Sequence, residues 1–123
     1  MPLNFFQRRR ILKNQNYLEL IPVVKVEYEL SDNKINLKIP KFKNEGFAQW
    51  FIPKRKSLYF YIHLDELGSA TWLEIDGKQN VKQICEKLTN KSGDKVSSVV
   101  ERVTKFLTKL YEQRYISFTL LEV

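Results

Sequence analysis

The sequence is poor in the residues that build most catalytic centres. It has one cysteine, Cys85, one histidine, His63, and four glycines that stand far apart. The counts exclude a zinc site made of cysteine and histidine clusters. The spacing of the glycines excludes a glycine-rich loop that cradles a phosphate, and no serine is flanked by glycines as in a nucleophile elbow. The sequence therefore predicts a protein that is not an enzyme and holds neither a metal nor a cofactor.

Long apolar runs are also missing. No uninterrupted run approaches the roughly 20 residues that a membrane span requires. At the N-terminus, the basic residues 8–10 follow a short apolar stretch, which is the reverse of the order in a secretory signal. Cys85 has no second cysteine with which to form an internal disulfide, and this favours a reducing compartment. We therefore expect a cytoplasmic protein.

The length and composition favour a single folded domain. The chain has 123 residues, of which 43% are hydrophobic and 13% aromatic. At this size a hydrophobic core needs no disulfide or metal to support it, and the aromatic content is too high for a disordered chain. We predict a basic and aromatic arm over residues 1–21 and one domain over 22–123, with residues 41–56 as an inserted loop.

The positive charge is concentrated in the first half of the chain. The net charge is +7, and residues 1–60 hold 12 Lys and Arg against 5 Asp and Glu, whereas residues 61–123 hold 9 of each. The surplus lies mainly in residues 8–13 and 54–56. A basic patch of this kind indicates a nucleic acid, a membrane surface or an acidic peptide as partner. The alternative is that the charge only keeps a small protein soluble.

Alternating apolar and polar residues predict three strands. The alternation runs over 24–30 and 35–39, and Asp32 and Asn33 between them tolerate the left-handed backbone of a tight turn. We predict a two-stranded antiparallel ribbon over 23–40 and a third strand over 57–64. In the third strand, one face is expected to carry Leu58, Phe60, Ile62 and Leu64, and the other Tyr59, Tyr61 and His63.

Three helices are expected after the strands. Asp65 is a good N-cap for a helix that reaches about residue 75, where an Asp-Gly turn ends it. Asn80 and Gln83 have the spacing of a capping box at the start of a second helix. Apolar residues then follow helical spacing over 96–113. Three strands followed by two short helices and a longer one predict an α+β domain with the outline of a winged helix-turn-helix.

The order and spacing of these motifs resemble the PqqD family. The similarity covers about 57–118, and the ribbon over 23–40 agrees with the family in its layout only. The matching motifs are Leu64-Asp65 at a strand end and cap, Ala70 and Trp72 in the first helix, Asp76-Gly77 in the turn, Val81-Lys82-Gln83-Ile84 in the second helix, and Val99 to Leu110 followed by Arg114-Tyr115-Ile116.

The resemblance implies a peptide-binding role. PqqD proteins are peptide chaperones in the making of pyrroloquinoline quinone, and their wider group binds the leader segments of ribosomal precursor peptides. The leader adds as a strand at the edge of the third strand, beside the third helix, and a partner modifying enzyme, often a radical-SAM enzyme, then acts. Carried over by position, the peptide-binding residues would be Leu58, Tyr59, Phe60, Tyr61, Ile62, His63, Arg102, Lys105, Phe106 and Lys109.

Two departures from the family favour a generic leader-binding role over quinone synthesis itself. The family usually has Pro-Glu-Gly directly before the third strand, where this chain has the segment 41–56, and the arm over 1–21 is longer than in quinone-pathway members. Three alternatives stay open: a winged-helix protein that binds nucleic acid, an interaction subunit that uses its basic arm, and coverage of Tyr59, Tyr61 and His63 by the aromatic segment 41–56. An aromatic arm and an open sheet edge are also compatible with a homodimer.

Overall fold

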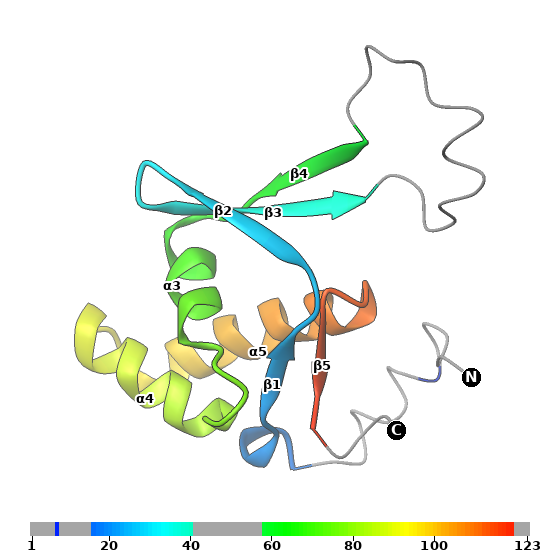
Figure 1. The fold of residues 1–123 in the computed structure, drawn as a ribbon. Coiled ribbons are helices and arrows are strands. Elements are labelled where there is room, and N and C mark those ends of the chain that lie inside the picture. Colours follow the sequence, from blue (N-terminus) through cyan, green and yellow to red (C-terminus); the bar gives the residue numbers. More distant parts are fainter. Residues whose placement is uncertain (1–6, 8–15, 41–57, 120–123) are drawn as a thin grey trace.

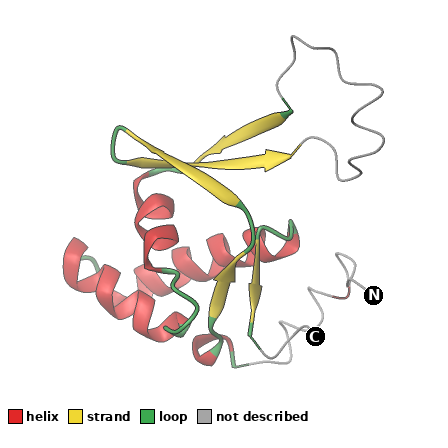
Figure 2. Cartoon of the chain, viewed as in Figure 1, coloured by secondary structure: helices red, strands yellow, loops and turns green. Residues whose placement is uncertain are grey.

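A three-stranded antiparallel sheet lies against a group of three helices in the computed structural model of the protein (Figure 1). The structure describes residues 7, 16–40 and 58–119. The predicted α+β order is confirmed (Figure 2). In chain order the elements are η1 (Tyr17–Glu19), β1 (Pro22–Val24), β2 (Glu27–Ser31), β3 (Lys34–Pro40), β4 (Tyr59–His63), α3 (Glu66–Glu74), α4 (Val81–Ser92), α5 (Val96–Glu112) and β5 (Ile116–Phe118).

The sheet has the strand order β2-β3-β4, with β3 in the centre. Asp32 and Asn33 connect β2 to β3 with φ angles of 52° and 62°, as the turn chemistry predicts. Such a two-residue turn with left-handed backbone matches the twist of a hairpin. Three alternate residues of β3, Ile35, Leu37 and Ile39, are buried. Their side chains lie on the face of the sheet that packs against the helices, and they belong to the hydrophobic core.

The predicted ribbon over 23–40 is wrong at its first end. Residues 22–24 form the separate strand β1, which pairs with β5 in a two-stranded antiparallel sheet, with Val24 opposite Ile116. The N–H of Lys25 donates to the carbonyl of Tyr115 at 2.9 Å, so the pairing of the two segments extends to Lys25. The period-2 pattern continues through the break, and a local pattern therefore does not reveal the change of partner.

The predicted helix caps are confirmed. The Asp65 carboxylate accepts from the N–H of Gly68 at 2.7 Å and begins α3. Asn80 and Gln83 form a capping box at the start of α4, where each side chain accepts from the backbone N–H of the other residue at 2.8 Å. Gly93 ends α4 with a φ of 75°, a conformation that glycine adopts at little cost.

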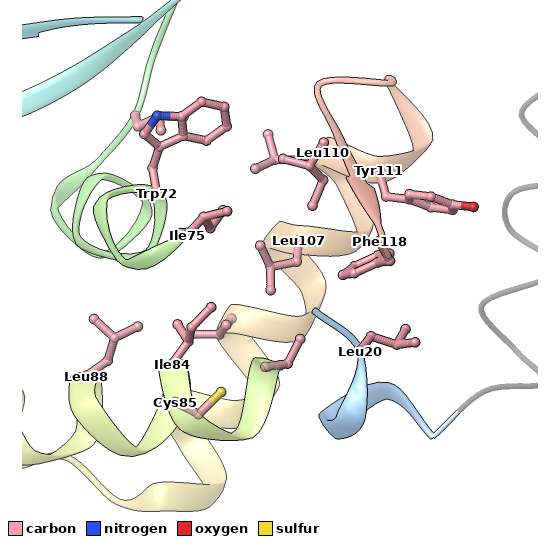
Figure 3. Packing of buried hydrophobic residues seen from close by; sticks show 14 of the residues in the cluster. Leu20, Trp72, Ile75, Ile84, Cys85, Leu88, Leu107, Leu110, Tyr111 and Phe118 are labelled. Atoms are coloured by element: carbon pink, nitrogen blue, oxygen red, sulfur yellow. The ribbon is translucent and has the colours of Figure 1, made fainter. Parts of the chain in front are cut away.

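The core lies between the helices and both sheets, and α5 contributes most to it (Figure 3). Its spacing places five residues on the buried face: Val99, Val103, Leu107, Leu110 and Tyr111. The sequence pattern also includes Val96, but this residue is 58% exposed because it stands at the first position of the helix.

The last residues of the predicted arm pack on the body of the domain. Leu20 is buried in the core, and its carbonyl accepts from the N–H of Val81 at the start of α4. The Tyr17 hydroxyl donates to the carbonyl of Thr104 at 3.2 Å and is hydrogen-bonded to the Thr108 hydroxyl at 2.9 Å. Residues 16–21 therefore connect α4 and α5.

Candidate functional site

The hydrogen bonds of Ile35 define which backbone groups of β4 face its open edge. Its carbonyl accepts from the N–H of Leu64 at 2.9 Å, and its N–H donates to Ser69 Oγ at 2.8 Å. Ser69 Oγ also donates to the carbonyl of Leu64, at 3.3 Å. Both backbone groups of Ile35 thus point toward the β4 side. Because this direction alternates along an antiparallel strand, those of Leu37 and Ile39 point the same way.

The backbone groups of β4 alternate in the same way between pointing toward β3 and pointing away from it. Ile62 stands opposite Leu37, and Phe60 opposite Ile39, so their N–H and C=O groups point back to β3. The N–H and C=O groups of Tyr61 and His63 point away from β3. Among the described residues, β4 pairs with β3 alone. A further strand would find its hydrogen-bond partners at these residues.

The two faces of β4 agree with the predicted division. Ile62 and Phe60 share the face of the buried residues opposite them, toward the helices, where Ile62 is half-buried and Phe60 is 42% exposed. Tyr61 lies on the other face and is 39% exposed. Leu58, just before the strand, is 49% exposed. An added strand would thus meet apolar side chains on the helix side and aromatic side chains on the outer side.

On the outer face, neighbouring β3 residues hold the side chains of β4. The ammonium group of Lys38 lies 4.4 Å from the centre of the Tyr59 ring, within cation–π distance. His63 Nδ1 is hydrogen-bonded to Asn36 Oδ1 across the sheet, so a structural role accounts for this histidine. The expected covering segment 41–56 lies outside the described residues.

Phe106 of α5 packs near the end of this strand. A Cβ built on Gly68 would be 3.2 Å from Phe106 Cε1 and 3.4 Å from Leu64 Cβ. The ring therefore packs where β4 ends and α3 begins. Phe106 is half-buried and contacts the core cluster. It joins the helix to the end of the candidate peptide edge.

The three predicted cations of α5 share one flank of the helix with Phe106 but line two different hollows. Arg102, Lys105 and Lys109 have the spacing i, i+3 and i+7, with Phe106 between them. Arg102 lines a hollow of about 320 Å³ between α3, α4 and α5. Lys105 and Lys109 line one of about 640 Å³ between α5 and η1. Lys105 is paired with Glu101 at 3.1 Å, whereas Arg102 and Lys109 have no ion pair within the described part of the chain.

The larger hollow includes residues that the sequence analysis does not single out. Its other walls are Tyr17 and Leu18 from the end of the arm, and Val100, Thr104, Thr108 and Glu112 from α5. Burial raises the pKa of Tyr17 strongly, while its hydrogen bond to Thr108 acts in the opposite direction. The phenol is therefore uncharged over the physiological pH range. The only sequence signal for this contact is the pair of threonines one turn apart, which is too weak to identify it.

The environment of Cys85 disfavours a reactive thiol. Cys85 is buried, and burial, followed by the charge of Glu86, raises the pKa of its thiol to about 11. A thiol in such a site is protonated and unreactive at neutral pH. The residues that the structure describes contain no group of three or more His, Cys, Asp or Glu side chains that could hold a metal ion. They also contain no helix that is long and apolar enough to span a membrane.

Comparison with known proteins shows that part of the chain is similar to a known family. Residues 59–116 match the family model described as coenzyme PQQ synthesis protein D (PqqD). The predicted PqqD resemblance is confirmed. The match begins at the first residue of β4 and ends at the first residue of β5, and so contains α3, α4, α5 and the candidate edge strand. The search of curated proteins and the search of solved structures found no match.

Proposed function

We propose that the protein is a non-catalytic peptide-binding module. It takes the leader segment of a ribosomal precursor peptide as an added strand on the open edge of β4, and presents that peptide to a modifying enzyme. The observation that carries this proposal is the edge itself: the backbone groups of Tyr61 and His63 point outward from a strand that, among the described residues, pairs on one side only. Strand addition needs such an edge, together with side-chain surfaces that give specificity.

The side chains around the edge favour an extended peptide with apolar and acidic residues. Phe60 and Phe106 provide exposed and half-buried aromatic surface on the helix side. Arg102 and Lys109 provide cations without an ion pair among the described residues, on the same flank of α5 as Phe106. Apolar side chains of the leader would contact the aromatic surface, and acidic ones the cations.

The family match supports a partner in a modification pathway. PqqD is described as a coenzyme PQQ synthesis protein, and we place this chain in that synthesis or in the maturation of another modified peptide. The enzyme it serves would be a modifying enzyme of the kind the resemblance implies, often a radical-SAM enzyme. The single cysteine is compatible with a cytoplasmic site of action.

The test is a titration of the full chain with leader peptides from neighbouring open reading frames, followed by backbone amide shifts. We expect saturable shifts at residues 58–63 and around Phe106. A Tyr61→Pro variant removes one outward N–H and spares the ladder to β3, so it should abolish binding. A Tyr61→Val variant keeps that N–H and should retain binding. Equal binding by the two variants, or no response to any nearby peptide, would contradict the proposal.

A further inference from the structure

The sheet has a second open edge, at β2. Among the described residues, β2 pairs with β3 alone. Leu30 stands opposite Ile35, whose N–H and C=O groups both point to the β4 side. The corresponding groups of Leu30 therefore point away from β3. By the alternation of the ladder the same holds for Tyr28, opposite Leu37. Two residues thus offer backbone donors and acceptors to a further strand on this side.

An apolar strip runs beside this edge on the face toward the helices. Tyr28 is 46% exposed and Leu30 61% exposed. Tyr28 contacts the buried Trp72 edge-on, with ring centres 6.0 Å apart. We call Tyr28 and Leu30 with the edge of β2 the β2 surface.

The opposite face of the same strand is acidic, in a chain whose net charge is +7. Glu27 and Glu29 are both exposed. Lys38 stands directly opposite Glu27 in the sheet, but its ammonium group lies over the Tyr59 ring on the other side. Glu29 stands opposite Asn36. Neither carboxylate has an ion pair with any residue that the structure describes.

These carboxylates disfavour a second copy of the chain as the occupant. Antiparallel pairing of β2 with itself overlaps all five residues in one register, which places Glu29 opposite Glu29 of the second copy. The register centred on Tyr28 places Glu27 opposite Glu29, and the one centred on Leu30 pairs Glu29 with Ser31 but overlaps only three residues. Like charges that face each other across two strands are destabilising, and charged edges are a common protection against self-pairing. The β2 surface therefore selects a different strand.

We propose that the β2 surface binds an extended segment of a partner protein in which lysine or arginine alternates with apolar residues. Its apolar side chains would cover Tyr28 and Leu30, and its basic side chains would face Glu27 and Glu29. This docking does not rest on leader binding, because it uses the opposite edge of the sheet. Both edges can be occupied at once, so the sheet can join two extended segments through β3.

The probe is a short acetylated and amidated peptide of alternating lysine and valine, with a matched peptide of alternating glutamate and valine. Both are titrated into the isotope-labelled full chain, and the backbone amide signals are followed. The lysine peptide should give saturable shifts over 27–31, and should bind more tightly than the glutamate peptide. Glu29→Lys should lower the ratio of the two affinities at least about threefold. Glu86→Lys makes the same change of charge on the exposed side of α4 and should leave the ratio unchanged.

Three results would overturn the proposal. The first is a lack of saturable shifts over 27–31 with the lysine peptide, including the case in which its shifts lie over 59–63 instead. The second is equal affinity for the two peptides with the unmodified chain, a comparison that needs no variant. The third is an equal effect of Glu29→Lys and Glu86→Lys, which would show that net charge alone determines binding.

Discussion

The ring of Phe106 lies against the backbone of Gly68, at the point where β4 passes into α3. A Cβ on Gly68 would be 3.2 Å from Phe106 Cε1 and 3.0 Å from the Asp65 Oδ1 that caps the helix. A residue without a side chain therefore lets α5 approach the end of the candidate edge strand. The contact between Phe106 and Gly68 therefore fixes where the Phe106 ring lies relative to the end of β4.

Gly68→Ala should destabilise the protein although alanine is the better helix former. The new methyl group would displace the Phe106 ring or the Asp65 carboxylate by a few tenths of an ångström. We expect a loss of about 1 kcal/mol in the free energy of unfolding, measured by urea denaturation, because overpacking and a weakened cap outweigh the gain in helix propensity.

A double-mutant cycle with Phe106→Leu provides the control for this prediction. The smaller leucine side chain leaves space for the methyl group, so the double variant should lose less stability than the sum of the two single variants, by at least about 0.5 kcal/mol. A stabilising Gly68→Ala, as helix propensity alone would give, would contradict the described contact.

Tyr17→Phe should also destabilise the protein, because the Tyr17 hydroxyl bonds to the Thr104 carbonyl and the Thr108 hydroxyl from a partly buried site. Removal of the hydroxyl leaves these partners without it, and we expect a loss of about 1 kcal/mol in the free energy of unfolding. Tyr61→Phe is the matched control, since Tyr61 is 39% exposed and its loss should be near zero. Equal effects of the two substitutions would mean that residues 16–21 do not dock on α5 in solution.

Glu74 should make the stability depend on acid pH. Partial burial raises the pKa of its carboxyl group. Hydrogen bonds from Lys91 and Gln79, together with the charges of Lys91 and Lys87, lower this pKa by more than burial raises it, so the net shift is downward. A lowered folded-state pKa stabilises the protein above the usual pKa of glutamate, and this contribution is lost as the pH falls through the folded-state value.

Glu74→Gln is the corresponding test. The variant lacks the ion pairs with Lys91 at 3.1 Å and Lys87 at 3.7 Å, and we expect it to be less stable at neutral pH by up to about 1 kcal/mol. Thermal unfolding followed from pH 7 to pH 3 should show the two proteins converge in stability as the pH falls. A constant difference over this range would contradict the assigned shift.

Local sequence signals predict the helices and the turn, but they do not identify the partners of the strands. The caps of Asp65 and Asn80 depend on residues three positions away, so their chemistry is visible in the sequence. The pairing of Val24 with Ile116 joins segments from opposite ends of the domain, and the alternating pattern before β2 is the same whichever strand it meets.

The candidate site shows the same limit. Period 2 predicts the two faces of β4, yet which backbone groups face its open edge follows only from the hydrogen bonds of Ile35. The exposure of Tyr28 and Leu30 also has a non-local cause, since α3 packs on β3 and leaves β2 at the margin of the sheet. Alternation alone predicts that both side chains are buried.

Cys85 should be inert as long as the domain is folded. The residue is 2% exposed, and burial raises the pKa of its thiol to about 11, so that about one molecule in a thousand carries a thiolate at pH 8. A disulfide reagent that releases a coloured thiol should react slowly with the native protein and rapidly in urea. Cys85→Ala should cost about 1 kcal/mol in stability through the lost packing and leave leader binding unchanged. Rapid reaction of the native thiol, or loss of leader binding by a folded Cys85→Ala variant, would contradict this prediction. Either result would indicate a functional role for Cys85 despite its burial in α4.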